Sequence, residues 1–109
     1  MTMICGHFNR SCNVVGTNFT NAKLEGTKFG NIVFQDNKLT NTNLSDCIFQ
    51  SVKFKSNIKF DNADFRNSYM EYLEIENNVY LRKCNLTNTT INNVKSTIWN
   101  KLYLFFYLR

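Results

Sequence analysis

An aromatic ring or a leucine falls on every fifth residue between Thr17 and Phe54, and this step constrains the fold more than any other feature of the chain. The centres of the repeat are Phe19, Leu24, Phe29, Phe34, Leu39, Leu44, Phe49 and Phe54. A step of five matches neither the 3.6-residue turn of an α-helix nor the two-residue alternation of a β-strand. The chain is therefore interpreted as an internal repeat before any secondary structure is assigned.

A smaller or aliphatic residue lies two positions before each of these centres. These residues are Thr17, Ala22, Thr27, Ile32, Asn37, Thr42, Cys47 and Val52. Three segments, Ala22–Gly26, Ala63–Asn67 and Cys84–Asn88, resemble the repeat of the pentapeptide-repeat family, which is approximately Ala-(Asp/Asn)-Leu-x-x. The resemblance extends from Thr17 to Asn93 and covers most of the chain.

The resemblance implies an all-β fold, a right-handed quadrilateral parallel β-helix with four pentapeptides to a coil and one on each face. In such a solenoid the centre and the residue two positions before it point inward. The centres resume at Phe60 after Phe54, and again at Leu81, with one extra residue before each of these two positions. Both extra residues would lie at the same corner, near Asn57 and Asn78, and asparagine is the non-glycine residue that best tolerates left-handed or bulged backbone.

About four coils of this repeat would stack the fifteen centres in four apolar columns, one on each face of the solenoid. The faces are numbered from first to fourth in the order in which the chain passes through them. The columns are Phe19/Leu39/Phe60/Leu81, Leu24/Leu44/Phe65/Leu86, Phe29/Phe49/Met70/Ile91 and Phe34/Phe54/Ile75. The inward companions on the fourth face are Ile32, Val52, Leu73 and Val94, which would touch at the ~4.8 Å spacing of neighbouring strands. Outward on the same face, opposite charges would pair, with Lys53 and Lys55 beneath Glu74 and Glu76.

The chain is expected to form one domain in three parts: an amino-terminal edge over residues 1–13, the repeat over residues 14–96 and a hydrophobic cap over residues 97–109. Cys12 and Val14 would continue the fourth face by one coil, whereas Met3, Ile4 and Phe8 do not fit the five-residue step. The first residues lack the pattern of a secretory signal, and four cysteines fit a reducing compartment. We therefore expect a bacterial, cytoplasmic protein.

No catalytic, cofactor-binding or metal-binding residues are predicted. Cys5, His7 and Cys12 resemble metal ligands, but a structural zinc site takes four ligands and the sequence offers no fourth nearby. The acidic residues fall at outward or corner positions, and His7 is the only imidazole, so a nucleophile lacks a base. We expect a protein that is not an enzyme and that uses no cofactor.

The net charge of +5 does not indicate a nucleic-acid-binding surface. Residues 17–96 contain ten basic and eight acidic side chains, interleaved, and the other three positive charges are Arg10, Lys101 and Arg109. A solvated mixed surface is favoured over DNA or RNA binding. Some pentapeptide-repeat proteins resemble B-form DNA and protect bacterial type II topoisomerases, but mimicry of a polyanion needs an acidic surface.

Two surfaces are candidates for contacts with proteins. The first is the third-face patch, formed by Ile48, Tyr69 and Tyr72, where the repeat expects polar residues. The second is the tail over residues 97–109, too short to span a bilayer, whose apolar residues are Ile98, Trp99, Leu102, Tyr103, Leu104, Phe105, Phe106, Tyr107 and Leu108. The tail is expected to cap the open end of the solenoid, as a helix or as a strand, and to meet its counterpart in a homodimer.

The sequence therefore predicts a non-enzymatic, homodimeric scaffold that binds a protein client whose identity it does not specify. The alternative is a DNA-mimicking binder of gyrase, which the charge of +5 and the short length disfavour. Neither nucleic acid nor a membrane is an expected partner, and a membrane-surface role for the tail is a weaker alternative.

Overall fold

The computed structural model of the chain describes residues 1–5, 11–76 and 78–96. The regular elements in these ranges are β-strands joined by turns. They are β1 (Thr2–Ile4), β2 (Cys12–Val15), β3 (Lys28–Gln35), β4 (Ile48–Lys55), β5 (Ile58–Lys59), β6 (Tyr69–Ile75), β7 (Val79–Tyr80) and β8 (Thr90–Ser96). None of these ranges contains a helix with the length and hydropathy that crossing a membrane requires.

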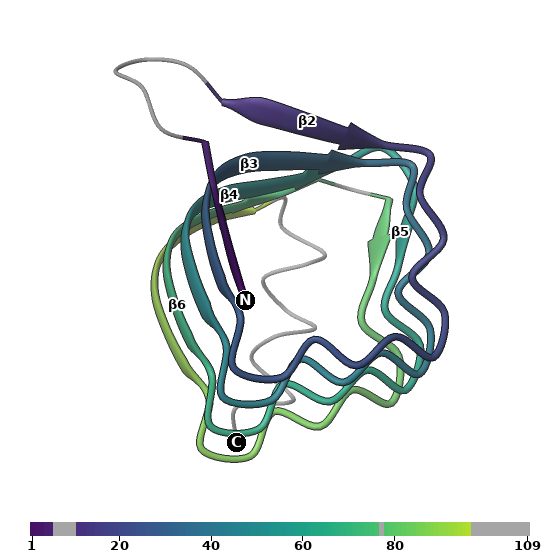
Figure 1. Cartoon of the computed structure of the whole chain (residues 1–109), viewed down its shortest axis with the longest axis vertical. Coiled ribbons are helices and arrows are strands. Elements are labelled where there is room, and N and C mark those ends of the chain that lie inside the picture. Colours follow the sequence, from purple (N-terminus) through teal and green to yellow (C-terminus); the bar gives the residue numbers. More distant parts are fainter. Residues whose placement is uncertain (6–10, 77, 97–109) are drawn as a thin grey trace.

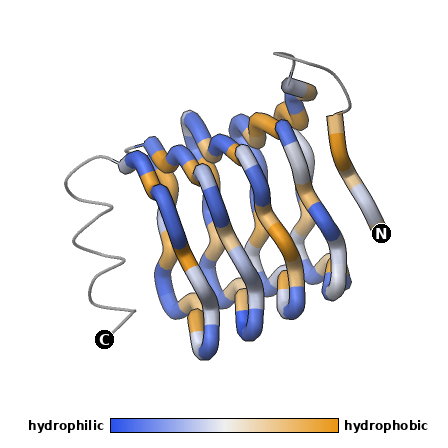
Figure 2. Tube along the Cα trace, turned by 90° about the vertical axis from the view of Figure 1, so that its left-hand side faces the viewer, coloured by the Kyte–Doolittle hydropathy of each residue, from blue (hydrophilic) through white to orange (hydrophobic). Residues whose placement is uncertain are grey.

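One wall of the molecule is a parallel sheet in the order β1-β3-β4-β6-β8, with β2 also paired to β3. Within it Phe29 pairs with Phe49 and Phe49 pairs with Met70, which are steps of 20 and 21 residues along the chain. A second sheet joins β5 to β7, and isolated parallel bridges link successive coils elsewhere. The chain therefore winds as a parallel β-solenoid of about four coils, seen along the stack in Figure 1 and from the side in Figure 2. Right-handed winding stays a prediction.

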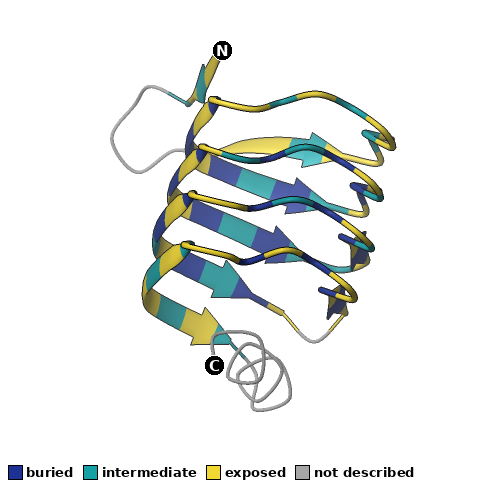
Figure 3. Cartoon of the chain, turned by 90° about the horizontal axis from the view of Figure 1, so that it is seen from below, coloured by how far each residue is buried: buried dark blue, intermediate teal, exposed yellow. Residues whose placement is uncertain are grey.

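The centres of the repeat are buried or half-buried in the solenoid. Figure 3 shows that buried residues recur at matching places in successive coils. The fully buried centres are Phe29, Phe34, Leu39, Leu44, Phe49, Phe54, Phe60, Phe65, Met70, Ile75, Leu81 and Leu86. Phe19, Leu24 and Ile91, which lie toward the two ends of the stack, are half-buried and pack against the others. Since burying one Phe or Leu contributes roughly 1.5–3 kcal/mol, the columns hold each coil against its neighbours.

A residue with positive φ turns the chain at each described corner, two positions after an inward centre. Thirteen residues other than glycine and two glycines have this conformation in the described ranges. Most are Asn, Asp or Gly, which adopt it at the lowest cost. The two with long side chains are Tyr72, with a φ of 54°, and Lys83, with a φ of 56°.

The first extra residue lies at the corner after the fourth face, where the irregular spacing predicts it. The step between paired residues grows from 20 at Lys55 to 21 at Lys59, so one residue is added between these positions. There Ser56 has a φ of 63°, and the Asn57 N–H donates to the carboxylate of Asp36 at 3.3 Å. Ser56 is thus the left-handed residue of this corner, and Asn57 is the inserted one.

The amino-terminal strands β1 and β2 both lie along β3. Cys12 and Val14 continue the fourth face in register, as expected. Met3 does not fit the five-residue step, yet it pairs with Phe29 on the third face and packs against the core. Phe8 lies outside the described residues. β1 and β2 together therefore cover one edge of β3. The five-residue step predicts the position of β2 but not that of β1.

Cys5 and Cys12 form a disulfide, with their Cα atoms 5.5 Å apart. The expectation of four reduced cysteines is therefore wrong for this pair. The Cys5 N–H donates to the Gly30 carbonyl and Cys12 pairs with Ile32, so the disulfide joins the two segments that lie along the edge of β3. Cys47 and Cys84 are free and buried, and burial raises the pKa of the Cys84 thiol to about 12.

Candidate functional site

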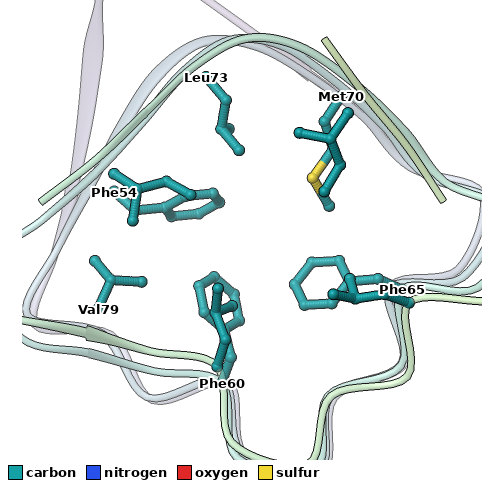
Figure 4. Close-up of a pocket in the computed structure, with 10 residues that line it drawn as sticks. Phe54, Phe60, Phe65, Met70, Leu73 and Val79 are labelled. Carbon is teal, nitrogen blue, oxygen red and sulfur yellow. The ribbon is translucent and has the colours of Figure 1, made fainter. Parts of the chain in front are cut away.

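Between the described coils, the interior cavity is too small for a ligand. The cavity, of about 20 Å³, lies in the later coils, and Figure 4 shows it enclosed by Phe54, Phe60, Phe65, Met70 and other apolar side chains. Sites for small molecules usually measure about 300 Å³ or more, and a buried water would need polar partners that these side chains do not supply. Any binding site in the described part of the chain therefore has to lie on the outer surface.

The third-face patch is exposed, and two of its residues are neighbours in the sheet. Ile48 of β4 pairs with Tyr69 of β6, and the two are 41% and 39% exposed. The Tyr69 hydroxyl donates to the Glu71 carboxylate at 2.9 Å, which orients the ring along the strand. Tyr72, at the corner where β6 turns from the third face to the fourth, is 57% exposed. The three side chains place apolar surface in solvent along one side of the solenoid.

Tyr72 shares the left-handed backbone of its corner but departs from it in residue type. The equivalent residues in the other coils are Asn31, Ser51 and Asn93, with φ values of 54°, 56° and 53°. An aromatic side chain in this left-handed region is strained, because its Cβ crowds the following carbonyl oxygen. An open groove of about 440 Å³ runs beside it between the last two coils, lined by Tyr72, Leu73, Glu74, Asn93, Val94 and Lys95.

Some charges on the second and fourth faces form ion pairs within the solenoid. On the fourth face the Lys53 ammonium lies 3.5 Å from Glu74 and 3.7 Å from Glu76. On the second face the Arg66 guanidinium lies 2.7 Å from Asp64, and its hydrogen bonds lower the pKa of the Asp64 carboxyl. Exposed pairs of this kind stabilise a fold only slightly, but they leave little net charge for a partner to recognise.

The first face carries three cations, Lys38, Lys59 and Arg82, and one acid, Asp61. Lys38 pairs with Lys59, and Lys59 pairs with Tyr80, in one outward column. Asp61 and Arg82 are neighbours in the next column, since flanking hydrogen bonds join the same two coils. A surface groove of about 310 Å³ is lined by Lys59, Asp61, Tyr80 and Arg82. The sequence signal that could have found this surface is the 21-residue spacing of Lys38 and Lys59 at one position of the repeat.

The remaining predicted residues are not brought together by the structure. Cys5 and Cys12 are bonded to each other, and His7 lies outside the described residues. In residues 1–5, 11–76 and 78–96 no group of three His, Cys, Asp or Glu side chains could hold a metal ion. The apolar tail residues Ile98, Trp99, Leu102, Tyr103, Leu104, Phe105, Phe106, Tyr107 and Leu108 also lie outside the described part.

Comparison with protein families and with solved structures identifies the repeat. A family model of pentapeptide repeats matches residues 11–55, in eight copies. The crystal structure of Rfr23, a pentapeptide repeat protein from the cyanobacterium Cyanothece 51142, superposes with a TM-score of 0.69 at 17% identity, over 79% of this chain and 57% of that one. At this identity the likeness concerns the fold, and the chain spans little more than half the length of Rfr23.

Two further structures match less well. A pentapeptide repeat protein from the Arabidopsis thaliana thylakoid lumen has a TM-score of 0.40 at 15% identity, over 87% of this chain and 75% of that one. A trypsin-treated form of QnrB1, a plasmid-mediated fluoroquinolone resistance protein, has a TM-score of 0.36 at 22% identity, over 78% and 53%. Nothing is concluded from these two scores. No curated protein matches the chain.

Proposed function

Since this chain is a pentapeptide-repeat protein whose solenoid interior is filled, we propose that it is a non-enzymatic scaffold that binds a client protein on its outer surface. The apolar columns and parallel ladders favour a rigid body whose outward side chains are held at fixed spacing. The described part of the chain offers shallow surface grooves and one small apolar cavity. This geometry suits recognition of a surface better than chemistry on a small substrate.

The observation that carries the proposal is Tyr72. Its left-handed backbone costs of order 1–3 kcal/mol, and its exposed ring recovers none of this in the core. Tyrosine is enriched among the residues that dominate protein–protein binding, because its ring buries a large area with few rotatable bonds. With Ile48 and Tyr69 beside it, Tyr72 would give a client an apolar anchor ringed by polar groups.

Variants of the patch test this proposal. Client proteins are captured from the native host with the wild-type chain, with the double variant Tyr69→Ser/Tyr72→Asn, and with Val15→Ser as a control at an exposed apolar residue of another face. A client that binds the wild type and the control but not the double variant is then purified and titrated by calorimetry. We expect truncation of the patch to weaken binding by about 2 kcal/mol. Retention of every client by the double variant would contradict the proposal.

The homodimer is a separate part of the proposal. It rests on the apolar tail over residues 97–109, in which Tyr103–Leu108 is apolar at both alternate sets of positions. A segment that caps one solenoid would bury only one of these sets, and the other would suit a twofold interface. Light scattering after size exclusion should give a dimer mass for the full chain and a monomer mass for a chain truncated after Ser96. An unchanged dimer would remove the tail from the interface.

A bacterial, cytoplasmic location is a further part of the proposal; the Cys5–Cys12 disulfide counts against it, and the state of the two cysteines in the native host tests it. Disulfides persist in oxidising compartments and are rare in the cytosol. Protein trapped with acid and an alkylating reagent from the native host should carry both residues as thiols if the proposal holds. Isolation with the disulfide intact would place the chain in an oxidising compartment.

DNA mimicry is not part of the proposal. A DNA-like surface needs rows of unpaired acidic groups, whereas here Asp64 is paired with Arg66 and Glu74 with Lys53. The first face, with its surplus of cations, has the sign of a surface that DNA would attract. We therefore expect no relief of quinolone inhibition in a gyrase supercoiling assay.

A further inference from the structure

Two like charges are stacked on the first face, and neither takes part in an ion pair with a described residue. Lys38 and Lys59 are in register in successive coils, and both are exposed. Within residues 1–5, 11–76 and 78–96, neither lysine has a carboxylate within the 4.0 Å of an ion pair. Like charges directly opposite each other in neighbouring strands are destabilising. The arrangement therefore lowers the stability of the free solenoid, although by a small amount in water.

The fourth face has an equivalent outward column in which the charges alternate in sign and so stabilise the fold. There Lys53, Glu74 and Lys95 occupy one outward column in alternating sign, each in register with the next. Nothing in the ladder prevents an acid at the position of Lys59, since exposed positions of this repeat accept either charge. The uncompensated column on the first face thus has no explanation in the stability of the solenoid itself.

The groove beside this column has the chemistry of a carboxylate site. Lys59 and Arg82 line it from adjacent coils, and Tyr80, which is 45% exposed, forms an apolar wall with a hydroxyl at its end. A guanidinium binds a carboxylate through two parallel hydrogen bonds, and an ammonium adds a point charge. Asp61 supplies one negative charge against the three positive charges of Lys38, Lys59 and Arg82, so the surface stays cationic.

We propose that the first face is a docking surface for an acidic polypeptide segment, whose carboxylates bind Lys38, Lys59 and Arg82 and whose backbone crosses the ring of Tyr80. The column spacing of about 4.8 Å is shorter than the ~6.6–6.8 Å between side chains on one side of an extended strand. The segment therefore crosses the coils obliquely. This proposal rests on the proposed function in one respect, which is that the chain binds other polypeptides. It does not depend on the third-face patch, because the first face is a separate surface.

A nucleic acid is the less suitable occupant. Binding to a phosphate backbone at physiological salt typically uses about 6–10 cationic contacts, and this face supplies three. The cationic surface also does not extend over the second face, where Arg66 is paired with Asp64. A short acidic segment needs only a few carboxylates and matches the extent of the surface.

The test uses a fluorescein-labelled glutamate-rich peptide, a second peptide in which each Glu is replaced by Gln, and a labelled oligothymidylate. Fluorescence anisotropy is measured with the wild-type chain, with Lys59→Glu and Arg82→Glu, and with Lys23→Glu. Lys23 is an exposed lysine of the second face, so its variant matches the change in net charge. Circular dichroism melts verify that each variant is folded.

We expect the acidic peptide to bind, the Gln peptide not to bind, and Lys59→Glu and Arg82→Glu each to weaken binding about tenfold or more. Lys23→Glu should change binding less than about twofold, because its charge acts only through the screened field. Equal losses at Lys59 and Lys23, absence of peptide binding at low salt, or tighter binding of the oligothymidylate would each overturn the proposal. The variant Tyr72→Asn should leave peptide binding unchanged, so a failure of the third-face patch and a failure of the first face are distinguishable.

Discussion

Phe29 and Phe49 are stacked face to face in successive coils, with ring centroids 4.8 Å apart and ring planes 12° from parallel. Phe34 and Phe54 repeat the arrangement on the fourth face, at 5.4 Å and 24°. The separation of the first pair equals the ~4.8 Å between neighbouring strands, so the hydrogen-bonded ladder sets the spacing of the rings. At these positions each coil packs a phenylalanine ring against the equivalent ring of the next coil.

Replacement of Phe49 by alanine is expected to be among the most damaging changes to the core. Its ring contacts Phe29 in the coil before and Phe54 and Phe65 on adjacent faces, and it is 1% exposed. Loss of these contacts and the cavity left behind should lower the free energy of unfolding by about 3–5 kcal/mol. Urea denaturation of Phe49→Ala measures this loss. Phe19→Ala, at a half-buried position near the end of the stack, should cost clearly less, and equal losses would argue against a core centred on these columns.

The architecture could be predicted because each inward position in one coil meets the same position in the next. A step of five residues therefore specifies which residues pair, and Phe29 with Phe49 follows from counting alone. The irregular step before Phe60 is equally informative, since an added residue is tolerated only at a corner, where Ser56 and Asn57 lie. The backbone ladder and the core thus follow from spacing, without any estimate of strand propensity.

Features that do not repeat could not be predicted in this way. Met3 precedes the regular repeat, so no periodicity predicts its pairing with Phe29 or the bond between Cys5 and Cys12. The cationic first face was missed because Lys38 and Lys59 are 21 residues apart in the sequence, and only the stacking of coils makes them neighbours. The third-face patch was found from the sequence, but the strain at Tyr72 required the backbone.

The disulfide is expected to stabilise the amino-terminal edge. In the unfolded chain the bond between Cys5 and Cys12 restricts a short loop, an effect worth about 2–3 kcal/mol by chain entropy. The double variant Cys5→Ser/Cys12→Ser should therefore unfold at a lower urea concentration than the oxidised wild type. Alkylation in denaturant gives an independent check: only Cys47 and Cys84 should react before reduction, and all four cysteines afterwards. Labelling of all four without a reductant would contradict the bond.

Alkaline pH should weaken the fold through Cys84. Burial raises the pKa of its thiol from 9.0 to about 12. Because the folded-state pKa is the higher one, the neutral thiol stabilises the fold fully below pH 9, and this contribution is lost as the pH rises from about 9 to about 12. Cys84→Ala removes the titration, and alanine already occupies this column at Ala22 and Ala63. The difference in unfolding free energy between wild type and variant should shift in favour of the variant between neutral pH and about pH 10.5, and a constant difference would contradict this origin.

Tyr72→Asn should stabilise the free protein while it removes the proposed anchor. Asparagine accepts the left-handed backbone that Asn31 and Asn93 already adopt at this corner, so the variant should raise the free energy of unfolding by about 1 kcal/mol. Tyr69→Asn is the matched control, because Tyr69 is not among the residues with positive φ and should give no such gain. Thermal and urea unfolding measure both variants, and the client from the capture experiment measures binding. A gain in stability together with a loss of binding is the combination expected of a residue kept for its contacts. A loss of stability on Tyr72→Asn would instead mean that the ring supports the fold.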